Sequence, residues 1–323
     1  MKYLKFILKA AVSAFLIYFV IRQIPLQELY RVMARSSYVA LVVALFALFL
    51  NEFICVLRLR FILLSEAENL PKQFLGLKKI SDIYFIGSFF GDFALTAVGG
   101  DTVKFFLFKR EHVGSRIRLA TVFLVDRVIA LGSLILLFFL AFGVNIFLGY
   151  PLPLIPLNFS FNTGLLFGFI AILLVVVSLF YAKDKIKIIV SLFTSHLLRV
   201  REFSLAFLYS LVYQFFIVVI IFAMYNSLHP ETSIPFFYFV LLVPIIIVVT
   251  TLPISLNGIG TRELLFVYLF GAIGGVKADL LALSLLFLVF SYVQGLYGGI
   301  LFLLSKKKNA DSAIFSDTSV SNK

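Results

Sequence analysis

The chain has 323 residues, a formal net charge of +12, 62% hydrophobic residues and a mean hydropathy of +1.09. A soluble domain of this length cannot bury so much apolar surface in one core, so the medium around it must itself be apolar. The basic residues border apolar runs, as they do in cytoplasmic loops of membrane proteins, and this distribution argues against nucleic-acid binding as the reason for the charge.

Apolar runs predict six membrane spans in chain order. Runs long enough to cross about 30 Å of hydrocarbon lie at 6–21, 38–57, 119–142, 164–181, 203–225 and 280–304. The first follows Lys2 and Lys5 as in a signal peptide, but no small-residue cleavage site follows it, so we expect a retained span. Two further apolar runs are interrupted, 83–100 by Asp92 and a Gly-Gly pair and 236–273 by Pro253 and an Asn-Gly-Ile-Gly sequence.

The distribution of Lys and Arg predicts the orientation of the spans. Segments 58–82, 104–118 and 182–203 and the tail at 306–308 are basic, whereas 143–163 and 226–235 contain no Lys or Arg. The positive-inside rule therefore places both termini and the basic loops in the cytoplasm, with the chain in the plasma membrane. One segment fits poorly, because 22–37 carries three arginines and yet must lie outside.

The two interrupted runs predict re-entrant hairpins and an inverted repeat. Both flanks of 83–100 are basic, so this run should enter and leave on the cytoplasmic side, while 236–273 should do so from outside. Span, span, hairpin, span over 1–142 then recurs over 164–304 in the opposite orientation, and such repeats mark a transporter's substrate site. We therefore expect an all-α polytopic membrane domain over 1–305 and a short disordered cytoplasmic tail over 306–323. The alternative is eight ordinary spans, two of them with flexible glycines.

The breaks themselves predict an anion site. A break in hydrocarbon is tolerated only where protein buries it or where it lines a wet cavity. Asp101 or Thr102 would cap a helix after the first break, and Thr261 would cap one after the second. Helix starts present free N–H groups and a positive dipole end, and Lys104 and Arg262 lie close enough to add charge for a phosphate.

Other ionisable residues within the apolar runs are functional candidates, because charges there are costly. These are Glu52, Asp92, Asp126, Arg127 and Glu263. Asp126 and Arg127 point about 100° apart on a helix, so at least one should pair with another helix, and Glu52 is a candidate partner for Arg127.

Two further groups of residues have both a functional and a structural interpretation. Arg58 and Arg60 follow the second span directly and either reach back into the cavity or extend to the headgroups. The residues of the breaks either shape the site or permit close helix packing; they are Gly99, Gly100, Asn257, Gly258 and Gly260.

Several chemistries leave no trace in the sequence. It contains no Cys/His metal spacing, no Walker loop, no G-x-S-x-G elbow and no dinucleotide-binding fingerprint. We therefore expect no metal, no cofactor and no catalytic residue. A membrane-embedded enzyme would need a nucleophile and a base within hydrogen-bonding reach, and no such pair is visible in the sequence.

Three segments resemble one known family. They are Gly-Gly-Asp-Thr-Val-Lys at 99–104, Val-Asp-Arg-Val-Ile at 125–129, and Leu-Pro-Ile-Ser-Leu-Asn-Gly-Ile-Gly-Thr-Arg-Glu at 252–263. Together they resemble the lysylphosphatidylglycerol synthase transmembrane-region family, the flippase-like domain of the multiple peptide resistance factor and of many standalone membrane proteins. Arg58-Leu59-Arg60 is similar to an Arg-Trp position of that family, with Leu59 where an aromatic residue is usual.

The resemblance implies a flippase for an anionic or aminoacylated phospholipid or a polyprenyl-linked lipid. The family's synthases carry a soluble aminoacyl-transfer domain after the membrane region, whereas this sequence continues for only about twenty residues after its last span, so lysyl transfer to lipid is not expected. The partners expected are lipids with anionic headgroups. Two alternatives remain, an accessory partner of an envelope glycosyltransferase or lipid-modifying enzyme, and an enzyme acting on lipid headgroups.

Overall fold

The computed structural model describes residues 26–65, 75–93, 99–110, 116–149, 199–252 and 255–320, together with Phe15, Tyr18, Phe19 and Arg22. Over these residues the protein is helical and contains no strand, which confirms the prediction of an all-α membrane protein. The predicted span at 164–181 and nearly all of the one at 6–21 lie outside the described residues.

Among the described residues, four helices are long and apolar enough to cross a membrane. They are α3 (Tyr38–Leu64), α6 (Arg116–Leu148), α9 (Val200–Ser227) and α12 (Lys277–Val320), and each contains one of the predicted spans. Shorter elements complete the described fold: α2 (Leu26–Arg35), α4 (Leu77–Phe93), α5 (Gly99–Arg110), α10 (Phe236–Thr251), α11 (Thr261–Leu265) and the π-helix η2 (Phe266–Phe270).

The first interrupted run folds as a helical hairpin. α4 and α5 pack antiparallel, because Gly91 lies against Gly100 near the break and the Nζ of Lys104 lies 3.8 Å from the ring centroid of Tyr84 further along. A Cβ added to Gly100 would come within 2.6 Å of the Gly87 carbonyl oxygen, so glycine is what allows the helices to approach so closely. α5 begins at Gly99, so Asp101 and Thr102 lie in its first turn, and the prediction that one of them caps it is wrong.

The second interrupted run also turns back on itself. The rings of Phe239 in α10 and Phe270 in η2 lie 4.7 Å apart, and near the break Gly258 lies against Thr250. Asn257, Gly258 and Gly260 have φ angles of 49°, 77° and 85°, a left-handed conformation that glycine adopts without strain.

The helix after the second break is not capped in the predicted way. Gly260, and not Thr261, is the N-cap residue of α11. The Glu263 carboxylate accepts a hydrogen bond of 2.6 Å from the backbone N–H of Gly260, while the Thr261 hydroxyl donates to Ser255. The N–H at the helix start is therefore satisfied from within the hairpin.

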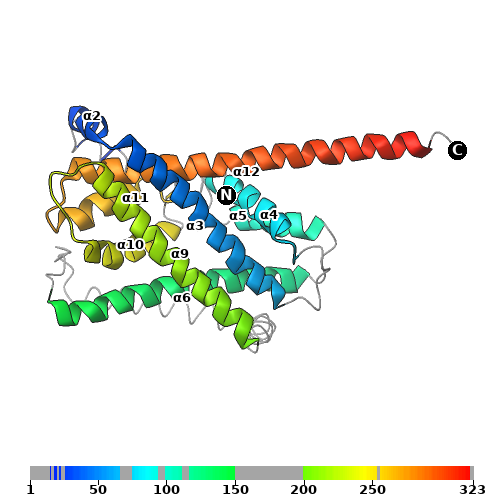
Figure 1. The fold of residues 1–323 in the computed structure, drawn as a ribbon, viewed down its shortest axis with the longest axis horizontal. Helices are drawn as coiled ribbons and strands as arrows, with labels where there is room; N and C mark the ends of the chain where they lie inside the picture. Colours follow the sequence, from blue (N-terminus) through cyan, green and yellow to red (C-terminus); the bar gives the residue numbers. More distant parts are fainter. Residues whose placement is uncertain are drawn as a thin grey trace.

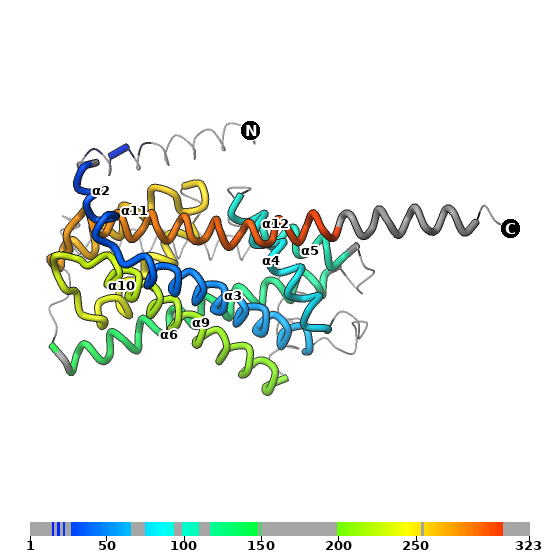
Figure 2. The backbone as a smooth tube through the Cα atoms, turned by 45° about the horizontal axis from the view of Figure 1, so that its top comes forward, coloured from blue at the N-terminus to red at the C-terminus, as the bar shows by residue number. Residues whose placement is uncertain are grey.

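Two central helices hold the hairpins together. α3 and α9 run antiparallel, with the N–H of Ser37 bonded to the Ser227 carbonyl at one end and Asn51 bonded to the Tyr213 carbonyl nearer the middle. In Figure 1, α3 and α9 both run obliquely between α12 and α6, and Figure 2 shows the same arrangement from another side. The α4–α5 hairpin packs against α12 through α4, and α10 of the second hairpin packs against α6. Each hairpin thus contacts the long helix from the other half of the chain.

A charged cluster accounts for Arg35, one of the three arginines of the 22–37 segment. The Arg35 guanidinium pairs with Asp279 at the start of α12, bonds Glu231 at 3.1 Å and donates to the Leu228 carbonyl at 3.2 Å. Asp279 is fully buried and also accepts from the backbone N–H of Glu231. Arg35 therefore serves an ion-pair network, so its charge does not argue against an outer location.

Because α4 and α5 are antiparallel, cysteines at Lys78 and Lys109 should react with a membrane-impermeant maleimide from the same side of the membrane. A cysteine at the exposed Asn226 should react from the opposite side. Cys55 is the only native cysteine, so Cys55→Ser gives a silent background for all three variants. Labelling of Lys78→Cys and Lys109→Cys from different sides would contradict the hairpin.

Close packing of α4 on α12 should make Gly298 intolerant of any side chain. A Cβ there would lie 1.9 Å from the Phe85 carbonyl oxygen, whereas a Cβ on Gly143 in α6 would meet no atom within 4 Å. We expect Gly298→Ala to lower the free energy of unfolding by about 1–3 kcal/mol. Gly143→Ala, the matched control, should leave it unchanged or raise it slightly. Thermal unfolding of the purified variants in detergent measures both effects.

Candidate functional site

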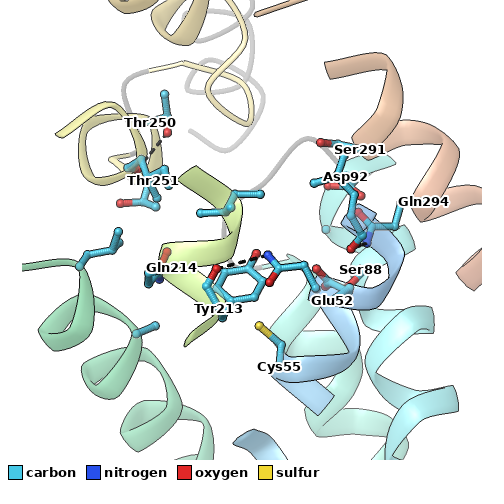
Figure 3. Close-up of a pocket in the computed structure, with 18 of the residues that line it drawn as sticks. Glu52, Cys55, Ser88, Asp92, Tyr213, Gln214, Thr250, Thr251, Ser291 and Gln294 are labelled. Atoms are coloured by element: carbon cyan, nitrogen blue, oxygen red, sulfur yellow. Dashed lines mark hydrogen bonds between the residues drawn. The ribbon is translucent and has the colours of Figure 1, made fainter. Parts of the chain in front are cut away.

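A cavity of about 670 Å³ lies where the two hairpins meet. Side chains from α3, α4, α5, α6, α9, α10, α11 and α12 line it, so the hairpins and all four long helices contribute. Near the two breaks the Asn257 side chain interacts with the Asp92 carboxyl, which links the second hairpin to the first. Figure 3 shows Glu52, Ser88, Asp92 and Gln294 on one side of the cavity, with Gln214, Thr250 and Thr251 on the other.

A buried ion pair joins α3 to α6 at the wall of the cavity. The Arg58 guanidinium donates to both carboxylate oxygens of Asp126, at 2.7 and 3.0 Å, and to the Ser210 hydroxyl at 3.2 Å. Arg58 is 4% exposed and Asp126 6%, so neither group extends to the headgroups. Of the two interpretations of Arg58, the structure supports the one in which it faces the cavity. The bidentate geometry is the strong form of this interaction.

Arg60 points elsewhere. Its guanidinium donates to the Leu75 carbonyl at 3.2 Å and so connects the end of α3 to the start of the first hairpin. Arg60 does not line the cavity.

Asp101 holds two cations at the first break. Its carboxylate accepts from Arg127 at 2.6 Å and from Lys104 at 3.4 Å. Asp126 and Arg127 therefore pair with α3 and α5 respectively, which confirms that these neighbours do not neutralise each other. The predicted Glu52–Arg127 pair is wrong, because Glu52 instead accepts a hydrogen bond of 3.1 Å from Ser88.

Arg262 and Glu263 form the charged group of the second break. An Arg262 nitrogen lies 3.1 Å from the Glu263 carboxylate, which also accepts from the Ser284 hydroxyl, and the guanidinium lies 5.5 Å from the ring centroid of Phe287. Glu263 is only 2% exposed and bonds the α11 backbone, so it orients the helix start while Arg262 faces the cavity.

The structure brings most of the predicted site residues to one cavity. Eight line it: Arg58, Gly100, Asp101, Lys104, Asp126, Arg127, Asn257 and Arg262. Five do not: Arg60, Gly99, Gly258, Gly260 and Glu263. The last three lie at or next to the second break and shape its backbone.

The sequence analysis did not identify several of the residues that line the cavity. Asn51 and Gln214 lie inside apolar spans and are 2% and 3% exposed, yet both face the cavity. Polar amides within spans are themselves a signal, since hydrocarbon penalises them. Ser88 gave no such signal, because a helical serine can bond its own backbone.

The cavity can hold a polar group within an otherwise apolar bundle. Large apolar side chains on the outer faces of α3, α6 and α12 are exposed, including Phe46, Phe139 and Ile300. Polar and charged groups turn inward, as expected for a protein surrounded by lipid. Among the described residues, no three or more His, Cys, Asp or Glu side chains come together in a geometry that would hold a metal ion.

A comparison with protein families matches residues 6–298 to the lysylphosphatidylglycerol synthase TM region. The match covers most of the chain, so the protein belongs to this family. No curated protein was found to match it.

Removing one member of the Arg58–Asp126 pair should cost more stability than removing both. Arg58→Met or Asp126→Leu alone leaves a buried charge without its partner, and we expect a loss of about 3–5 kcal/mol. The double variant leaves no such charge and should regain a large part of the loss. Thermal unfolding in detergent tests this, and equal or additive losses in the double variant would contradict it.

Proposed function

We propose that this member of the lysylphosphatidylglycerol synthase TM region family moves an anionic or aminoacylated phospholipid, or a polyprenyl-linked lipid, between leaflets. The observation that carries the proposal is the cavity of about 670 Å³ lined by charged side chains from both hairpins. A lipid crossing the membrane must bring its polar headgroup through hydrocarbon, and such a cavity supplies the polar surroundings it needs. The acyl chains would remain in lipid.

The cations of the cavity suit a phosphate. Lys104 lies in the second turn of α5 and Arg262 in the first turn of α11, so each break has one cation close to it that faces the cavity. Both are already paired, Lys104 with Asp101 and Arg262 with Glu263. A phosphate would compete with those carboxylates, which favours binding that is weak enough to allow release.

A membrane-embedded enzyme is the second candidate, and one observation favours it. The Ser88 hydroxyl donates to the Glu52 carboxylate at 3.1 Å inside the cavity, which is the arrangement of a nucleophile and a base. Conversion of a lipid headgroup by the purified protein in detergent, abolished in Ser88→Ala, would support this candidate. A Ser88→Ala variant that still moves lipid would support transport.

A third candidate is an accessory partner of an envelope enzyme. It is distinguished by co-purification, since a partner protein retained through purification together with an inactive isolated chain would favour it over transport.

Charge removal at the breaks should impair transport. In liposomes containing a fluorescent anionic phospholipid, we expect Lys104→Ala and Arg262→Ala to lower the rate of leaflet exchange about tenfold, because each removes a phosphate contact. Lys78→Ala is the matched control, since Lys78 is exposed outside the cavity and should keep the wild-type rate. Folded Lys104→Ala and Arg262→Ala proteins with wild-type rates would remove this site from consideration.

A further inference from the structure

The cavity contains two carboxylates that form no ion pair within the described part of the chain. Glu52 on α3 accepts only from Ser88, and Asp92 on α4 interacts with Asn257. Ser88 and Asp92 are one helical turn apart, so the two carboxylates lie on the same wall of the cavity (Figure 3). Both carboxylates line the cavity without forming a salt bridge, although the charge of Lys104 acts on both of them.

Two buried amide oxygens add to this surplus of acceptors. The Oδ1 of Asn51 and the Oε1 of Gln214 have no hydrogen-bond partner, although each residue is at least 97% buried and lines the cavity. The Asn51 amide nitrogen is already bonded to the Tyr213 carbonyl, which fixes its oxygen as the free group. A buried acceptor without a donor costs about 1–3 kcal/mol, so its retention points to an occupant that supplies positive charge or N–H groups.

The charged groups of the cavity, with every carboxylate ionised, favour a positively charged occupant. Its carboxylates are Glu52, Asp92, Asp101 and Asp126, with Glu263 behind Arg262; its cations are Arg58, Lys104, Arg127 and Arg262. The other titratable groups facing it are Cys55, Tyr84 and Tyr213, which are neutral when protonated. When all five carboxylates, Glu263 included, are ionised, they exceed the four cations by one, and a single bound positive charge would neutralise the difference.

We propose that Glu52 and Asp92, together with the free amide oxygen of Asn51, which precedes Glu52 on α3, form a subsite for a small monovalent cation. Oxygen donors of this kind suit a hard cation such as Na⁺, and they suit equally the ammonium group of a lipid headgroup. The subsite lies beside the cations proposed above to bind phosphate and rests on the same proposed function. In the proposed transport, a positively charged ion or headgroup would therefore bind at the wall of the cavity that carries Glu52 and Asp92.

Binding can be measured without any lipid movement. We expect the melting temperature of the purified protein, in detergent at one fixed pH, to rise by about 4 °C or more when Na⁺ replaces choline at equal ionic strength. If the cation is borne by lipid, the rise should instead follow addition of phosphatidylethanolamine and not of phosphatidylglycerol. The two series therefore distinguish a free ion from a headgroup.

Matched variants identify the carboxylates. E52Q/D92N keeps the shapes of both side chains and should lose the rise, and each single variant gives an independent measurement if the double variant does not fold. Asp82→Asn is the control, because Asp82 lies on α4 outside the cavity lining and should keep the wild-type response. No rise in the wild type, or an equal rise in folded E52Q/D92N, would overturn the subsite.

Transport then separates the two proposals. In liposomes, an inward Na⁺ gradient or an ethanolamine headgroup should accelerate lipid movement by the wild type several-fold and leave E52Q/D92N unaffected. If the wild type moves no lipid but shows the rise in melting temperature, the flippase proposal fails while the cation subsite remains.

Discussion

Hydrocarbon does not solvate charge, and this constraint organises the described part of the protein. A charged side chain inside the bilayer must be paired, hydrogen-bonded or in contact with water, otherwise its burial costs several kcal/mol. Arg58 meets the requirement through Asp126, Arg127 through Asp101, and Arg262 through Glu263. Each of the first two pairs joins two helices, so neutralising the charges also fixes how the helices are arranged.

The same constraint acts on the backbone where the helices are interrupted. Residues that leave the helical conformation expose N–H and C=O groups, which lipid cannot satisfy. Among the described residues next to the breaks, Asp92, Gly100 and Asn257 line the cavity, and at the second break Glu263 supplies the bond that the helix start needs. Glycines make the backbone geometry next to the breaks possible. Gly258 and Gly260 adopt left-handed conformations, and Gly100 lets α5 approach α4 closely. The described residues next to both breaks and most of the charged residues consequently line one cavity.

The two hairpins pack reciprocally on the long helices. The first hairpin rests on α12 and the second on α6, while α3 and α9 cross between them. An inverted repeat would produce this reciprocal packing, although the repeat itself stays a prediction because parts of both halves lie outside the described residues.

Much of the fold was predictable from the sequence. Apolar length alone located α3, α6, α9 and α12. Asp92 with a Gly-Gly pair located the first break, and Pro253 with an Asn-Gly-Ile-Gly sequence located the second. The angle between successive helical residues was enough to show that Asp126 and Arg127 have different partners. These features are local, because they depend on the hydropathy and the helical geometry of a short segment.

Which residues meet across the bundle was decided only by the tertiary structure. The sequence suggested Glu52 for Arg127, but Asp101 takes that place, and Arg58 turns to Asp126. A span that is apolar on nearly every side carries little periodic signal for which face turns inward, so its rotation and neighbours cannot be inferred from hydropathy. The positions of Asn51 and Gln214 in the cavity follow from how α3 packs on α9, which no single helix specifies.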